Sequence, residues 1–156
     1  MRGGEGGINL LQNCAFCGQI WYETSPKCRK KPKLVQTHTR CVVLGVAALG
    51  GKIYAAGGTQ LGGARLSSVE VFDPQTNSWA AVAPMSTVRG DFTLTAVRGK
   101  LYAVGGLAGD NSALASVEAY DPGSNQWSAV APMSTLERTR SGCLTASPRA
   151  IRPPIE

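Results

Sequence analysis

The stretch that decides the fold is "GKIYAAGG", from Gly51 to Gly58, which returns 48 residues later as "GKLYAVGG", from Gly99 to Gly106. A lysine among glycines can belong to a phosphate-binding loop, but that loop needs the pattern G-x-x-x-x-G-K-[ST] between a strand and a helix. Here Ile53 follows the lysine, and the next residues do not suggest a helix. The stretch is therefore interpreted as a strand that ends in a sharp turn, and its return as a repeat.

The repeat extends far beyond the glycines. An ungapped alignment of Lys52–Val88 with Lys100–Leu136 gives 20 identities over 37 positions. A fixed period in this range is typical of proteins built from copies of one supersecondary unit. The identities that carry the unit's structure are Tyr54 and Tyr102, Gly57 and Gly105, Gly58 and Gly106, Glu70 and Glu118, Asp73 and Asp121, and Trp79 and Trp127.

Each unit predicts four short strands. Apolar residues alternate with polar ones or form short runs, and "DPQTN" and "DPGSN" supply turn residues between the last two strands of each unit. Short connections favour antiparallel neighbours, and a four-stranded sheet at this period is a propeller blade. The expected strands are 42–49, 52–56, 68–73 and 78–82 in the first unit, and 93–97, 100–104, 116–121 and 126–130 in the second.

These residues resemble the kelch repeat, in which a tyrosine precedes a Gly-Gly pair and a tryptophan begins the fourth strand. The wording "APMST" and "SVE" before "DP" is most similar to the kelch-like proteins, the substrate receptors of cullin-3 ubiquitin ligases. The resemblance implies an all-β chain of two four-stranded antiparallel kelch blades. It also implies a protein-interaction module, with a ubiquitin-ligase substrate as the leading partner and actin as the alternative.

The resemblance leaves enzymes of the same architecture, such as galactose oxidase and the sialic-acid mutarotases, as a distant alternative. The first of these needs histidine ligands for copper, and His38 is the only histidine of this chain. The carboxylates of the repeats do not form an evident acid–base pair. We therefore expect no enzymatic activity and no cofactor.

The chain divides into four segments by this pattern. Residues 1–39 are basic and lack the repeat, so they are predicted to be disordered; 40–88 and 89–136 are the two kelch repeats; and 137–156 begin a third repeat that breaks off in a proline-rich tail. Two blades cannot close a propeller, which generally uses about four to eight. We therefore expect an incomplete propeller with irregular flanks, whose exposed blade faces allow self-association.

Candidate partner-binding residues lie in the loops that join the second and third strands and in those that join consecutive blades. Arginines there could hold acidic groups through two parallel hydrogen bonds. A structural alternative remains open for Arg89 and Arg138, which could instead pair with carboxylates such as Glu70 and Glu118 within the blades. The candidates are Arg65, Arg89, Asp110, Asn111, Ser112, Arg138 and Arg140.

The formal net charge of +6 does not indicate a nucleic-acid partner. Residues 41–130 carry five Lys/Arg and six Asp/Glu, so the positive excess lies in the flanks and not on the repeats. The run "KCRKKPK", Lys27–Lys33, is either a solvated tail or a nuclear-import signal. No stretch approaches the roughly 20 apolar residues of a membrane helix, and a cytoplasmic location is expected, with the nucleus as an option.

A weak zinc candidate lies before the repeats. Cys14 and Cys17 form a C-x2-C pair, and Cys28 and either His38 or Cys41 could complete four ligands. Structural zinc commonly uses a second closely spaced pair, which is missing here. Free thiols are the favoured interpretation, and no metal is expected.

Overall fold

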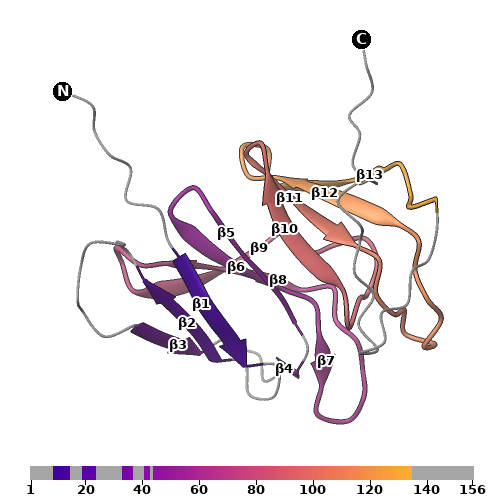
Figure 1. Cartoon of the computed structure of the whole chain (residues 1–156), viewed down its shortest axis with the longest axis horizontal. Coiled ribbons are helices and arrows are strands. Elements are labelled where there is room, and N and C mark those ends of the chain that lie inside the picture. Colours follow the sequence, from indigo (N-terminus) through magenta and orange to yellow (C-terminus); the bar gives the residue numbers. More distant parts are fainter. Residues whose placement is uncertain (1–8, 15–18, 24–32, 37–40, 43, 135–156) are drawn as a thin grey trace.

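The computed structural model describes residues 9–14, 19–23, 33–36, 41–42 and 44–134, and every regular element among them is a strand (Figure 1). The all-β prediction is therefore confirmed. Two four-stranded antiparallel sheets form the centre of the molecule, one for each sequence repeat.

Blade 1 and blade 2 are built from strands in the same order. In blade 1 the order is β5-β6-β8-β9, and in blade 2 it is β10-β11-β12-β13, with all neighbours antiparallel. The bounds match the expected strands closely except at the start of the first unit. They are Gly45–Leu49 (β5), Lys52–Ala56 (β6), Val69–Asp73 (β8), Ser78–Val82 (β9), Thr93–Val97 (β10), Lys100–Val104 (β11), Val117–Asp121 (β12) and Gln126–Val130 (β13).

The 48-residue period holds at the level of single contacts. Lys52 pairs with Asp73 in blade 1 and Lys100 with Asp121 in blade 2, both at 3.2 Å. The backbone N–H of Gln75 donates to Asp73, and that of Gly123 donates to Asp121. These hydrogen bonds, together with the paired lysines, lower the pKa of each aspartate. The Asp-Pro turns are thus fixed in the same way twice.

Two short pairings were not expected, and the first of them contains Val42, which the sequence assigned to the strand 42–49. β4 (Cys41–Val42) pairs with β7 (Thr59–Gln60), a stretch that the sequence placed in a loop. One period later Gly90 and Leu107 form the equivalent bridge. This pairing ties the segment before each blade to the loop that follows the second strand.

The N-terminal segment differs from the irregular structure that its lack of repeat predicted. Its described residues form a three-stranded antiparallel sheet, β1-β2-β3, and β1 lies beside β5 of blade 1. The runs "NLLQNC", "QIWYE" and "KLVQ" contain aliphatic and aromatic residues that suit strands, and strand pairing does not require the period. The strands are Asn9–Cys14 (β1), Gln19–Glu23 (β2) and Lys33–Gln36 (β3).

The main core lies between the two blades. We call the side of a blade that carries Glu118 and Trp127 in blade 2 its leading face, and the opposite side its trailing face. The trailing face of blade 1 packs on the leading face of blade 2, where the rings of Tyr54 and Tyr120 lie 5.9 Å apart. The buried members of this core are Ala47, Tyr54, Ala56, Val69, Val71, Met85, Phe92, Leu94, Leu101, Ala103 and Tyr120.

Candidate functional site

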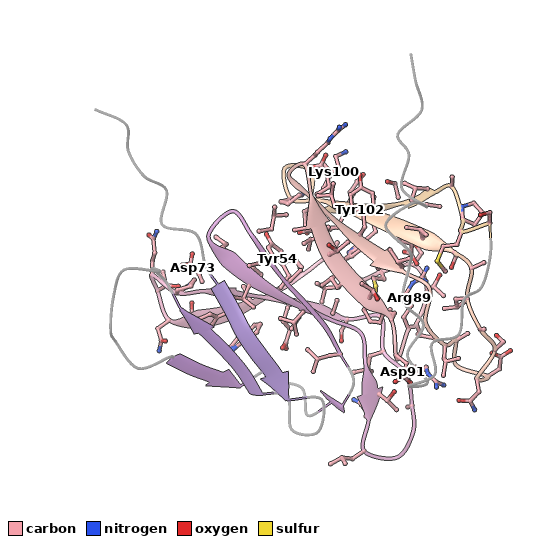
Figure 2. The ribbon with its side chains drawn as sticks, viewed as in Figure 1. Tyr54, Asp73, Arg89, Asp91, Lys100 and Tyr102 are labelled. Carbon is pink, nitrogen blue, oxygen red and sulfur yellow. The ribbon has the colours of Figure 1, made fainter. Side chains whose placement is uncertain are left out.

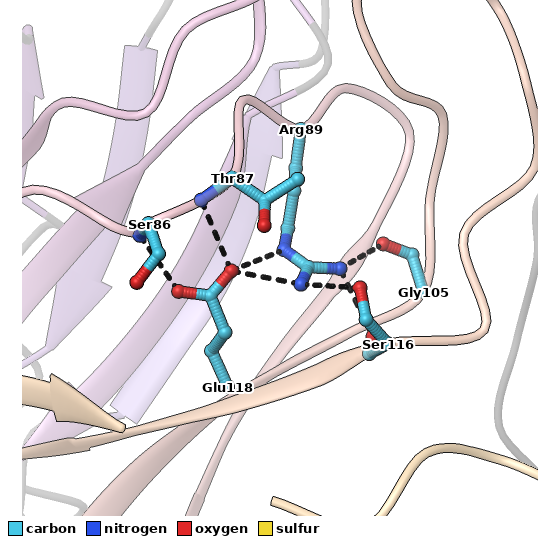
Figure 3. Close-up of polar contacts among 6 residues, drawn as sticks. All are labelled: Ser86, Thr87, Arg89, Gly105, Ser116 and Glu118. Carbon is cyan, nitrogen blue, oxygen red and sulfur yellow. Dashed lines mark hydrogen bonds and ion pairs between the residues drawn. The ribbon is translucent and has the colours of Figure 1, made fainter. Parts of the chain in front are cut away.

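Arg89 lies in the segment between the blades and is completely buried (Figure 2). Its Nε and Nη2 donate to Oε1 of Glu118 at 3.3 and 2.9 Å. Its Nη1 donates to the carbonyls of Gly105 and Ser116, and its Nη2 also donates to the Ser116 hydroxyl (Figure 3). All five N–H groups of the guanidinium are used, so none remains for a partner.

Glu118 is the anionic half of this buried pair. Burial acts to raise the pKa of its carboxyl, but hydrogen bonds from Arg89 and from the backbone N–H of Ser86 outweigh that effect, and the pKa is lowered. The backbone N–H of Thr87 also donates to it, at 3.2 Å. The sequence left two roles open for Arg89, partner binding and pairing with a blade carboxylate, and this geometry supports the second.

Arg65 joins the loops of the two blades. Its Nη1 donates to the Ala108 carbonyl at 2.9 Å and to Oδ1 of Asn111 at 2.7 Å. Arg65 comes from the loop after β7 in blade 1, while Ala108 and Asn111 belong to the equivalent loop of blade 2. Two candidates that stand 46 positions apart in the sequence are thereby brought together at one end of the molecule.

The tip of the second loop is a hydrogen-bonded turn. Oδ1 of Asp110 accepts bonds from the backbone N–H and the hydroxyl of Ser112 at 2.9 and 2.6 Å, and these bonds lower the pKa of Asp110. Asn111 between them has a φ of 67°. Its side chain accepts from Arg65, so the turn presents an ordered polar edge to solvent.

Two exposed apolar side chains were missed in the sequence, Leu61 in the loop after β7 and Val88 in the segment between the blades. Leu61 is 76% exposed, and Val88 is 36% exposed. Val88 is beside the second loop, since a Cβ on Gly109 would lie 3.6 Å from it. An isolated leucine before Gly62-Gly63 was the available signal. We define the loop surface as Leu61, Arg65, Val88, Asp110, Asn111 and Ser112.

The residues that the sequence marked as structural lie in and between the blades. Trp79 packs against Phe72 with ring centroids 5.3 Å apart, and Trp127 against Tyr120 with centroids 5.1 Å apart, both pairs in a tilted arrangement. Gly57 has a φ of 58°, and a Cβ there would lie 2.6 Å from the Arg89 carbonyl oxygen. The glycine pair therefore ends the strand and lets the next segment of backbone pass close by.

Several candidates cannot be placed. Arg138 and Arg140 lie outside the described residues, as do the possible zinc ligands Cys17, Cys28 and His38. Cys14 is in β1 and Cys41 in β4. Across the described ranges, no three His, Cys, Asp or Glu side chains gather as a metal site would require, and no helix has the length and apolar character to span a bilayer.

The two blades coincide with matches to a known sequence family. The family model of the kelch motif matches residues 40–86 and 89–134, which are the two blades with their leading segments. The chain belongs to the kelch-repeat family. The paired tyrosines, glycines and tryptophans are positions of its repeats, and the two four-stranded sheets that the structure describes have the architecture of β-propeller blades.

Relatives of this kelch chain are larger proteins. Kelch-like protein 36 of Bos taurus is 38% identical over 82 residues, which cover 53% of the chain and 12% of that protein. The matched region therefore spans about an eighth of the relative's length. Among solved structures, the one titled "Structure of YjhT" superimposes with a TM-score of 0.63 at 16% identity, covering 75% of this chain and 46% of that one. This likeness concerns the fold alone.

Proposed function

We propose that this kelch chain is a protein-interaction module whose partner docks on the loop surface. The supporting observation is the bond between Arg65 and Asn111, which holds the loops of both blades together. The loops also expose apolar side chains, Leu61 in the loop of Arg65 and Val88 beside Gly109, so the surface combines an arginine with apolar contact area. Arginines and buried apolar anchors are characteristic of protein-binding surfaces.

The leading partner class is a substrate of a cullin-3 ubiquitin ligase, for which this chain would resemble the substrate-recognition part. Sequence similarity to Kelch-like protein 36 supports this class. Actin is the alternative partner. An enzymatic role is not favoured, because Glu118 is engaged by Arg89 and Asp121 by Lys100, which leaves neither as a free acid or base. We place the chain in the cytoplasm, with the nucleus as an option through Lys27–Lys33.

Site-specific photo-crosslinking tests the docking surface. A crosslinkable amino acid at Ser112 should capture the partner in cells, while the same group at Gln75, an exposed turn residue of blade 1, should not. The substitution Leu61→Asp should abolish capture at Ser112 without lowering thermal stability, because Leu61 is mostly solvated. Equal capture from Ser112 and Gln75 would contradict docking at the loops.

The identity of the captured protein separates the partner classes. A client whose half-life lengthens when cullin-3 is depleted supports the ligase role. Co-sedimentation of the purified chain with filamentous actin, lost in Leu61→Asp, supports the cytoskeletal role. If neither is found, both partner assignments are wrong, whatever the result at the docking surface.

A further inference from the structure

The contact between the blades contains a clamp on one residue's backbone. Trp127 of blade 2 donates its indole N–H to the carbonyl oxygen of Ala83 at 2.9 Å. Oδ1 of Asn125, also from blade 2, accepts the backbone N–H of Ala83 at 3.0 Å. Both polar groups of Ala83, at the end of blade 1, are thereby satisfied by the leading face of the blade that follows.

Blade 1 has the equivalent residues, but no backbone carbonyl among the described residues accepts the indole N–H of its tryptophan. Asn77 and Trp79 stand 48 positions before Asn125 and Trp127, and Asn77 and Asn125 share a φ of 53°. The indole nitrogen of Trp79 is shielded from solvent and has no hydrogen-bond acceptor among the described residues. A shielded donor without an acceptor lowers the stability of the fold by about 1–3 kcal/mol. A carbonyl oxygen placed here, as Ala83 places one beside Trp127, would remove that cost.

The sheet β1-β2-β3 does not supply that carbonyl. β1 of this sheet contacts β5 of blade 1, but the Trp79 indole nitrogen has no hydrogen-bond acceptor among the described residues. The leading face of blade 1 is otherwise of the same apolar kind as that of blade 2, and it is already buried, with Ile53 0%, Ala55 6% and Phe72 1% exposed, so what it lacks is the acceptor for Trp79. Its residues Val46, Ile53, Ala55 and Phe72 stand where blade 2 has Leu94, Leu101, Ala103 and Tyr120.

The trailing face of blade 2 shows the complementary deficit. Ala83 and Met85 of blade 1 are half-buried and buried, whereas their equivalents Ala131 and Met133 are exposed and half-buried. Val130 on this face is 38% exposed. Tyr102 is also more exposed than its equivalent in blade 1. This face therefore has the side chains for a blade-to-blade contact, and the described residues leave it partly uncovered.

We propose that a second copy of this chain fills both deficits by packing head to tail. The trailing face of blade 2 in one copy meets the leading face of blade 1 in the other, and Trp79 donates to the Ala131 carbonyl of the second copy. Asn77 accepts the backbone N–H of that alanine. The contact repeats the one between Ala83 and blade 2 within a chain, and the second copy displaces the sheet β1-β2-β3 from blade 1.

Head-to-tail contacts close into rings when the rotation between units permits. Propellers generally contain about four to eight blades, so two to four copies, each adding the two blades that the structure describes, would supply the blades of one closed ring. This inference does not depend on the proposed partner, because it uses the blade faces and not the loop surface.

The test is the molar mass of the full-length chain in solution as a function of its concentration. Light scattering after size-exclusion chromatography should show an integral multiple, two to four, of the chain mass. Val130→Asp should return the chain to a monomer with an unchanged circular dichroism spectrum, because the carboxylate lies in the contact and not in the core. Trp79→Phe, which removes only the donor from an aromatic residue, should weaken association about tenfold.

Leu61→Asp is the matched control, since it places the same charge on the loop surface and should leave association unchanged. A wild-type chain that stays monomeric over the whole concentration range overturns the inference. So does an oligomer that persists in both Val130→Asp and Trp79→Phe, because the contact would then lie elsewhere.

Discussion

Arg89 and Glu118 form a buried ion pair with an Nη2–Oε1 distance of 2.9 Å, and their side chains are 0% and 4% exposed. The arginine comes from the segment that links the blades and the glutamate from the third strand of blade 2. Because every remaining donor of the arginine and both oxygens of the glutamate have partners, removal of either residue leaves a buried charge and several unpaired groups.

Arg89→Met should therefore lower the free energy of unfolding by about 3–5 kcal/mol. Lys100→Met is the matched control, because it also removes one half of an ion pair in blade 2, but that pair is largely exposed. It should cost much less than Arg89→Met, because water and salt screen an exposed pair. Urea denaturation followed by tryptophan fluorescence measures both. Equal losses would mean that burial does not set the value of the Arg89 pair.

Acid should remove the contribution of the same pair. The pKa of Glu118 is lower in the folded protein than its ordinary value of 4.5, so the folded state binds the proton less readily than the unfolded chain does. The stabilisation by this ion pair is complete above about pH 4.5 and is lost as the pH falls through the folded-state pKa of Glu118. Other carboxylates titrate nearby, so the comparison that isolates Glu118 is with Glu118→Gln. The stability of that variant should fall less steeply below pH 4.5.

Gly57→Ala should destabilise the chain more than Gly50→Ala. The two glycines have φ values of 58° and 57°, so alanine meets the same backbone strain, about 1–2 kcal/mol, at either position. A Cβ at Gly50 has no neighbour within 4 Å, whereas one at Gly57 would lie 2.6 Å from the Arg89 carbonyl oxygen. That clash should add about 1–3 kcal/mol. Thermal melts of the two variants suffice, and the same midpoint for both would show that the backbone gives way freely.

Substitution of the two equivalent tryptophans by phenylalanine should have opposite consequences. Trp127→Phe leaves the Ala83 carbonyl without its donor and should cost about 1–3 kcal/mol. Trp79→Phe removes a shielded N–H that has no acceptor among the described residues, and should be neutral or stabilising when measured at concentrations at which light scattering shows monomers. Loss of stability in both variants would indicate that ring packing, and not the indole hydrogen bond, is what matters.

The sequence predicted the blades well because the same residue types recur at equivalent positions of both units. Tyr54 and Tyr102, or Trp79 and Trp127, are informative as pairs, since a shared register leaves few arrangements that bury both members. For Arg89 the sequence left partner binding and pairing with a blade carboxylate both open, and the pairing with Glu118 is the one observed.

The loop surface could not be predicted in the same way. The loops that contain Arg65 and Asn111 differ in sequence between the units, and their contact depends on a turn in which Asn111 takes a positive φ. No periodicity reports such a contact. The strands before residue 40 escaped prediction for a related reason: they fall outside the repeat on which the assignment of strands relied.

The position of Arg89 has a practical consequence for anyone who divides this chain. Its backbone N–H and carbonyl bond to Leu66 and Gly58 of the first repeat, while its side chain bonds to Gly105, Ser116 and Glu118 of the second. A cut at the sequence boundary between 88 and 89 would remove from the N-terminal fragment the two backbone hydrogen bonds that Leu66 and Gly58 make with Arg89. A cut after Gly90 would leave the other with an uncompensated carboxylate. The unit that evolution copied and the unit that could be expressed alone are therefore different, and no single cleavage point serves both halves.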